Sequence, residues 1–186
     1  QYTAWYRNGK KQMEGSFSKD KETGQWEEWY ANGQQKSVTR HADSLVYLME
    51  YSDSTGKKLI TNGNGSLVTY FPGGKKQAEG NYAGGLKTGL WKFYMKNGDK
   101  DYEVVFAQGK MNGAYKTWYS GNKIKAEGSY SKGEEDGHWI WYFEDGKPKT
   151  SGNMSHNMRT GYWVYFTDAG DTEATGYFKN DEQDST

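Results

Sequence analysis

Histidine is the side chain most often used for acid–base chemistry and metal binding near neutral pH, and the chain has three: His41, His138 and His156. No two of them stand four residues apart, and no His-Glu-x-x-His zinc pattern occurs. Cysteine is absent, which excludes disulfides and thiolate metal sites. We therefore interpret each histidine as a solvent-facing or turn residue, and we expect no metal and no cofactor.

Acidic residues form two further patterns that could do chemistry. The run Glu134-Glu135-Asp136 lacks the alternating ligands and the distal glutamate of a calcium loop, so we interpret it as a solvated bend. Glutamates also recur at one repeat position, where two of them could act as the carboxylate pair of a glycosidase. Their regular recurrence next to lysines favours a charge ladder instead; these residues are Glu14, Glu79, Glu103 and Glu127.

Glycine-rich segments and serines offer no clearer catalytic motif. Gly63-Asn64-Gly65 and Gly73-Gly74 are not part of a phosphate-binding G-x-x-x-x-G-K-[ST] loop, and no helical pattern follows them. No serine lies in a nucleophile elbow. The sequence therefore predicts a protein that is not an enzyme and has no catalytic residues.

The elements that would position these residues come from a repeat. A large residue returns every 24 positions over most of the chain, which is typical of a repeat architecture. Taking that residue as position zero, we find eight units that start at Tyr2, Trp26, Met49, Leu67, Trp91, Tyr115, Trp139 and Trp163. A glycine precedes position zero by two, and further large residues follow at positions three and four.

Each unit has the pattern of a β-hairpin. Asn-Gly or a similar pair stands at positions six and seven, as in Asn32-Gly33, and predicts a type I′ turn. A second strand follows, often with glycine at position 13 and a large residue at position 15. We expect the glycine to let a neighbouring ring lie flat across it. The predicted fold class is all-β: a repeat array of antiparallel β-hairpins forming one long twisted sheet.

We expect residues 1–186 to form a single array, with a degenerate region at 34–64. Gly56 and Gly74 are only 18 residues apart, which indicates either a deletion in one connecting loop or a kink near residue 60. The aromatics that we expect to be structural are Trp26, Trp29, Tyr70, Trp91, Tyr94, Tyr115, Trp118, Trp139, Tyr142, Trp163 and Phe166.

Composition limits the partners. The 24 basic and 24 acidic residues balance, which gives no electrostatic signature for nucleic acid or an anionic membrane. No apolar run approaches the roughly 20 residues of a membrane-spanning helix. The chain begins with Gln1 rather than Met, which favours a trimmed N-terminus and, slightly, an exported or cell-envelope protein over a cytoplasmic one.

The repeats resemble the MORN repeats, and more closely their bacterial variant with the pattern G-x-W-x-x-Y-Y-x-x-G. Residues 24–33 and 137–146 carry that pattern, and the resemblance covers nearly the whole chain. It implies a β-hairpin ladder used for protein contacts, with lipid binding proposed for some members. The variant family includes antitoxins of the YwqK type, so the resemblance also implies a toxin as one kind of protein partner.

Positions that vary between repeats are the ones that can encode a partner. Position two is aromatic in three of the last four units, as Phe93, Trp141 and Tyr165. Exposed, these residues would form an aromatic stripe that binds a protein or a glycan; the alternative is that they thicken the core. The leading hypothesis is a non-catalytic scaffold for protein–protein interaction, including an antitoxin or immunity protein. The alternative is a carbohydrate or cell-wall binding module. The sequence does not fix the oligomeric state.

Overall fold

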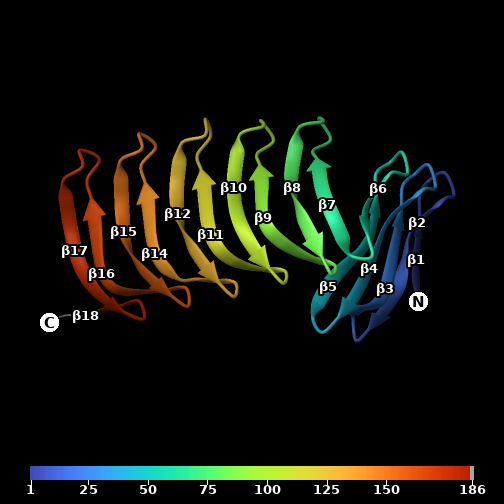
Figure 1. The fold of residues 1–186 in the computed structure, drawn as a ribbon, viewed down its shortest axis with the longest axis horizontal. Helices are drawn as coiled ribbons and strands as arrows, with labels where there is room; N and C mark the ends of the chain where they lie inside the picture. Colours follow the sequence, from blue (N-terminus) through green and yellow to red (C-terminus); the bar gives the residue numbers. More distant parts are fainter. Residues whose placement is uncertain (185–186) are drawn as a thin grey trace. The chain divides into compact units, whose positions relative to one another are not determined.

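The computed structural model describes residues 1–184, which form eighteen β-strands and no helix (Figure 1). Every strand pairing within the described residues is antiparallel. The all-β class and the succession of antiparallel hairpins are therefore confirmed. Eight two-strand repeats account for most of the strands. One of these strands is split into β13 (Glu134–Glu135) and β14 (Gly137–Tyr142), and the short strand β18 (Glu182–Asp184) follows the last repeat.

The chain divides into two compact units, residues 1–67 with 80–88, and residues 68–79 with 89–186. The first unit contains six complete strands: β1 (Tyr2–Trp5), β2 (Lys11–Ser18), β3 (Lys21–Trp29), β4 (Gln35–Ala42), β5 (Leu45–Ser52) and β6 (Lys58–Thr61). Three strands each contribute residues to both units: β7 (Asn64–Tyr70), β8 (Lys76–Ala83) and β9 (Leu86–Tyr94).

The second unit contains the other nine strands: β10 (Lys100–Ala107), β11 (Lys110–Trp118), β12 (Ile124–Ser131), β13 (Glu134–Glu135), β14 (Gly137–Tyr142), β15 (Pro148–Ser155), β16 (Met158–Phe166), β17 (Thr172–Lys179) and β18 (Glu182–Asp184). From β10 onward consecutive strands pair, except β13 and β14, which are two parts of one split strand and both pair with β12. Each unit is treated by itself below, and the single array over 1–186 stays a proposal.

The glycine two residues before position zero makes a bulge. Gly161 has φ +68°, a left-handed conformation that glycine adopts without steric cost. Between β15 and β16 the register passes from the pair Ser151 and Val164 to the pair Asn153 and Thr160, so Gly152 faces three residues of β16. This bulge turns Trp163 onto Gly152, which explains why the motif begins with glycine and places tryptophan two residues later.

Three tryptophans at position zero, Trp26, Trp139 and Trp163, cover the glycine at position 13 of the preceding repeat. A Cβ added at Gly152 would lie 2.2 Å from the Trp163 ring, and one at Gly15 would lie 2.1 Å from the Trp26 ring. Where position 13 carries the buried Val104, the residue paired with it at position zero is the smaller Tyr115. The expected flat contact of ring and glycine is confirmed, and the two positions change together in size.

The tight turns within the repeats and the bends between them differ in backbone geometry. At Asn32-Gly33 only the glycine has positive φ, and Gly33 donates its N–H to the carbonyl of Tyr30 at 2.8 Å, which fits a type I turn followed by a left-handed glycine. The polar bends between units instead have two consecutive residues with positive φ, as at His156-Asn157. The type I′ prediction was therefore wrong at the Asn-Gly pairs, and type I′ geometry occurs at the bends.

The degenerate region is a shortened hairpin within the first unit. Strand β6 has four residues where other second strands have eight, and its register with β7 pairs Ile60 with Gly65 and Thr61 with Asn64. The bend at Asn62-Gly63 donates from Gly63 N–H to the carbonyl of Met49 at 2.8 Å. The strands on both sides of this bend are short, and they remain paired with each other.

Candidate functional site

The predicted binding residues lie on the same side of their strands as the core tryptophans, because positions zero and two of a strand share a face. Trp91, Trp139 and Trp163 at position zero are 2%, 1% and 3% exposed. Phe93, Trp141 and Tyr165 at position two are only partly buried. Within the second unit, position zero therefore supplies the core and position two forms its solvent-facing border.

These rings form a continuous row. The ring centroids of Phe93 and Tyr102 are 4.3 Å apart. Those of Tyr102 and Tyr115 are 6.0 Å apart, and those of Tyr115 and Trp139 are 5.5 Å apart. The row continues from Trp139 to Trp141, whose centroids are 5.4 Å apart, and from Trp141 to Trp163, at 5.6 Å. It ends at Tyr165, whose centroid lies 6.4 Å from that of Trp163. Aromatic pairs at such distances contribute about 0.5–1.5 kcal/mol each beyond their buried area.

A hollow of about 410 Å³ opens at the end of the row, over β14, β15 and β16. Its lining consists of Trp141, Lys149, Thr150, Met154, Arg159, Trp163, Tyr165 and Asp181. The structure thus brings Trp141 and Tyr165 together around one site. Phe93 is not among the lining residues and lies elsewhere in the row, stacked on Tyr102.

One cation in this hollow is held rigidly. The Arg159 guanidinium donates from Nε to Asp181 Oδ1 at 2.9 Å and from Nη1 to the Tyr165 hydroxyl at 3.1 Å. Its central carbon lies 4.1 Å from the centroid of the Phe178 ring. The hydrogen bonds to Asp181 and Tyr165 raise the pKa of Arg159, and those from the backbone and side chain of Arg159 lower the pKa of Asp181.

The second cation is free to meet a ligand. Lys149 is exposed, its Nζ lies 5.7 Å from the centroid of the Phe143 ring, and within residues 1–184 it has no carboxylate partner. Arg159 and Asp181 largely neutralise each other, so the hollow carries one surplus positive charge. An apolar floor with a positive rim can hold an apolar group that has an anionic neighbour.

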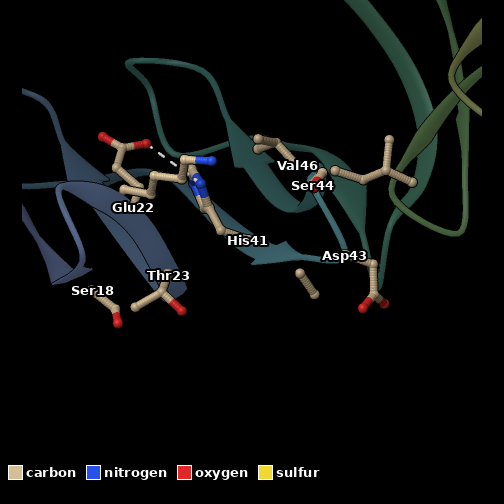
Figure 2. A pocket seen from close by; sticks show the side chains of 10 residues that line it. Ser18, Glu22, Thr23, His41, Asp43, Ser44 and Val46 are labelled. Atoms are coloured by element: carbon tan, nitrogen blue, oxygen red, sulfur yellow. Dashed lines mark ion pairs between the residues drawn. The ribbon is translucent and has the colours of Figure 1, made fainter.

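A second hollow, of about 460 Å³, lies in the first unit and mixes polar and apolar side chains (Figure 2). Its lining consists of Ser18, Lys21, Glu22, Thr23, His41, Ala42, Asp43, Ser44, Leu45 and Val46. His41 Nδ1 lies 3.4 Å from Glu22 Oε2, and its Nε2 lies 3.2 Å from the Thr39 hydroxyl. The His41 side chain is only 13% exposed, so the prediction of a solvent-facing histidine was wrong for this residue.

Comparison with known proteins adds the family. Residues 111–132 and 135–156 match the family described as MORN repeat variant. The match covers two consecutive repeats of the chain. No curated protein matches the chain.

One solved structure illustrates how little a fold likeness adds here. It is titled "Crystal structure of GtfA/B complex bound to UDP and GlcNAc" and matches with 17% identity and a TM-score of 0.25. The match covers 62% of this chain and 24% of that one, so this chain spans about a quarter of that protein's length. At such a score the likeness carries no argument.

The aromatic residues that we expected to be structural differ in burial. Among those expected to be structural, Trp26, Trp91, Trp118, Trp139 and Trp163 are buried, and Trp29, Tyr94, Tyr115, Tyr142 and Phe166 are partly buried. Tyr70 is 59% exposed. Position zero is thus the most consistently buried, and position three is mixed.

The repeated glutamates are structural partners within the hairpins. Tyr142 donates its hydroxyl proton to Glu127 at 2.5 Å, and Lys116 Nζ lies 3.0 Å from the other oxygen of that carboxylate. These contacts lower the pKa of Glu127, whereas burial and then the carboxylate raise the pKa of Tyr142 to about 12. The same arrangement joins Tyr94, Glu79 and Lys76. The charge-ladder interpretation is confirmed at both glutamates.

The remaining histidines and acidic residues singled out from the sequence form no further site within residues 1–184. His138 and His156 are exposed, as predicted. Within residues 1–184, no three His, Cys, Asp or Glu side chains are grouped so that they could hold a metal ion. The same residues contain no helix long and apolar enough to span a bilayer.

Sequence reasoning found the rings of the apolar hollow but missed its charged rim. Arg159 stands four residues before position zero, where the other repeats that extend that far carry Glu22, Leu45, Gly63, Lys87, Met111 and Glu135. That variation between otherwise similar repeats was a usable signal, of the same kind that drew attention to position two. Asp181 lies in a bend, where polar residues are expected anyway, so its role could not be distinguished.

Proposed function

We propose that this chain is a non-catalytic scaffold that binds a protein partner through the aromatic row of its second unit. The observation that carries the proposal is the row from Phe93 to Tyr165 together with the apolar hollow at its end. MORN repeats are in general interaction repeats, which supports this class of function.

The division of labour between repeat positions supports the choice of surface. Position zero is buried on a glycine and is required for packing, whereas position two varies and keeps part of its ring accessible. Aromatic residues with partly accessible rings are the side chains that contribute most to protein interfaces. The aromatic row can therefore change its partner between related proteins without altering the hairpins.

Site-specific photo-cross-linking tests the proposal. A photoreactive amino acid replaces Lys149 at the hollow or, as the control, Tyr177 on the other side of the sheet, which is 56% exposed. We expect a discrete protein adduct from position 149 and none from position 177. Equal labelling from both positions, or labelling from 177 alone, would place the contact surface elsewhere.

An antitoxin or immunity protein is the specific case that the variant family suggests. The partner identified by cross-linking is then expressed alone and together with this chain. Rescue of growth by the wild-type chain, and reduced rescue by Trp141→Ala, would support that role. A partner that has no effect on growth when expressed alone would remove it.

Carbohydrate binding is the second candidate, because the partly buried rings of Trp141 and Tyr165 line the hollow beside polar groups. Sugar rings stack on such faces while side chains bind their hydroxyls. A glycan array decides this point. Binding that requires Trp141 would replace the protein-contact proposal, and an array without signal would leave it in place.

A further inference from the structure

The apolar hollow has a composition that selects its ligand. We infer that it accepts one aromatic side chain of a partner peptide in which acidic residues flank that side chain. This inference rests on the proposed protein-contact function and specifies the partner's chemistry at the same site.

The floor and walls favour an aromatic group. Trp141, Trp163 and Tyr165 contribute three rings, and Met154 contributes a thioether, which makes favourable contacts with aromatic edges. The volume of about 410 Å³ lies near the lower end of the roughly 300–1,000 Å³ of ligand pockets. One ring can therefore enter the hollow that Trp141, Trp163 and Tyr165 line.

The rim favours acidic neighbours. Asp181 Oδ1 accepts hydrogen bonds from both the backbone N–H and Nε of Arg159, so this anion is already matched by a cation. Lys149 is left with no carboxylate partner in residues 1–184, and its ammonium group is solvated at the edge of the hollow. A carboxylate beside the inserted ring would pair with Lys149, and complementary charge of this kind also speeds association.

The same hydrogen bonds disfavour a sugar. A glycan needs several free donors and acceptors around the stacked ring. Here the Thr150 hydroxyl already donates to the Val164 carbonyl at 2.9 Å, and the Tyr165 hydroxyl already accepts from Arg159 at 3.1 Å. The Thr150 donor and part of the acceptor capacity of Tyr165 are therefore already used, and Lys149 offers donors only, which leaves fewer acceptors for sugar hydroxyls.

Three synthetic peptides test the inference with the full chain. The first has the sequence DDFDD, the second replaces the ring (DDADD), and the third reverses the charges (KKFKK); isothermal calorimetry measures each Kd. We expect DDFDD to bind at least about tenfold more tightly than the other two. Binding of DDFDD should also weaken near 1 M salt, where the screening length falls to about 3 Å.

The chain provides a matched control for the charge. Lys125 stands one repeat before Lys149, and its Nζ lies 5.6 Å from the Tyr119 ring, the counterpart of the 5.7 Å between Lys149 and Phe143. Position two of that repeat is Thr117 rather than an aromatic residue. We expect Lys149→Glu to weaken DDFDD binding by about threefold to tenfold, since an exposed ion pair becomes a repulsion. Lys125→Glu should leave the Kd unchanged.

Two results would overturn the inference. One is equal affinity for DDFDD and DDADD, which would show that no ring enters the hollow. The other is equal weakening by Lys149→Glu and Lys125→Glu, which would show nonspecific attraction. If instead the peptides fail while cross-linking from position 149 still yields a protein adduct that depends on Trp141, only this inference fails. If neither peptide binding nor the cross-linked adduct is observed, the proposed function is rejected as well.

Discussion

The same pair of repeat positions carries different chemistry beside the two hollows. In the first unit the residue four before position zero is Glu22 and the residue at position 15 is His41, and Glu22 Oε2 lies 3.4 Å from His41 Nδ1. In the second unit the corresponding residues are Arg159 and Phe178, with the guanidinium 4.1 Å from the ring centroid. The first pair lines a hollow of mixed polar and apolar side chains, and the second holds Arg159 at the rim of an aromatic one.

The comparison teaches which part of a repeat is fixed by folding. Trp26 and Trp163 sit alike over Gly15 and Gly152, so the packing of ring on glycine is common to both units. The residues at positions −4 and 15 differ without any change in strand pairing. The hairpin frame therefore depends on a few positions, and the others are available for recognition.

Removing a ring at position zero should have the largest effect. Trp163→Ala leaves a cavity over Gly152, and we expect the free energy of unfolding to fall by about 3–5 kcal/mol. Trp141→Ala, at position two of the neighbouring repeat, removes a partly exposed ring and should cost about 1–2 kcal/mol. Urea denaturation followed by circular dichroism measures both variants. Equal losses would assign Trp141 to the core and would remove the distinction between the two positions.

Filling the space beneath a ring should come next. In Gly152→Ala the new Cβ would overlap the Trp163 ring, so we expect a loss of about 1–3 kcal/mol through overpacking. Gly176 occupies the same position in the last repeat, where an added Cβ would meet Phe178 at 3.1 Å and no tryptophan. Gly176→Ala should therefore cost less than Gly152→Ala. Thermal unfolding of the two variants would contradict the account if their order were reversed.

Converting the polar pair of the first unit into the aromatic form should stabilise that unit. Position 15 carries a large apolar residue in most repeats, and the His41 ring centroid already lies 6.1 Å from that of Trp26. We expect His41→Phe to raise the free energy of unfolding by about 0.5–1.5 kcal/mol, the value of an aromatic pair. Glu22 is 43% exposed and stays hydrated without its partner. A destabilised variant would show that the contact between Glu22 and His41 is needed for folding.

The smallest effect concerns pH and the rim of the aromatic hollow. Arg159 lowers the pKa of Asp181 in the folded chain, so the carboxylate favours folding above its unfolded pKa of about 3.9. That contribution disappears as the pH falls through the lower folded pKa. Asp181→Asn should thus be less stable than the wild-type chain at pH 7, and the difference should shrink below about pH 4. A difference that stays constant between pH 7 and pH 3 would contradict the assigned ion pair.

Much of the frame could be predicted from the sequence because it depends on residue size and spacing. The interval of 24 placed Trp139 and Trp163 on consecutive hairpins, and the glycines at position 13 indicated the rings that cover them. The turn types could not be predicted, because Asn-Gly allows positive φ at both residues without requiring it at the first.

The site was only partly predictable, for a related physical reason. Trp141 and Tyr165 were recognisable because an aromatic residue at a variable position stands out against Thr117. The Arg159–Asp181 pair joins residues 22 positions apart through a bend whose geometry no local pattern fixes. Likewise, the burial of His41 depends on its neighbours in the folded sheet and not on its own polarity.

The most direct test of the central claim is the affinity of the partner identified by cross-linking for two variants of the chain. Trp141→Ala alters position two beside the aromatic hollow, and Tyr162→Ala alters a ring that is 58% exposed on the other side of β16. We predict that the Kd rises at least about tenfold for Trp141→Ala, as for a central interface residue, and does not change for Tyr162→Ala. An unchanged Kd for Trp141→Ala, or a larger rise for Tyr162→Ala, would contradict the claim.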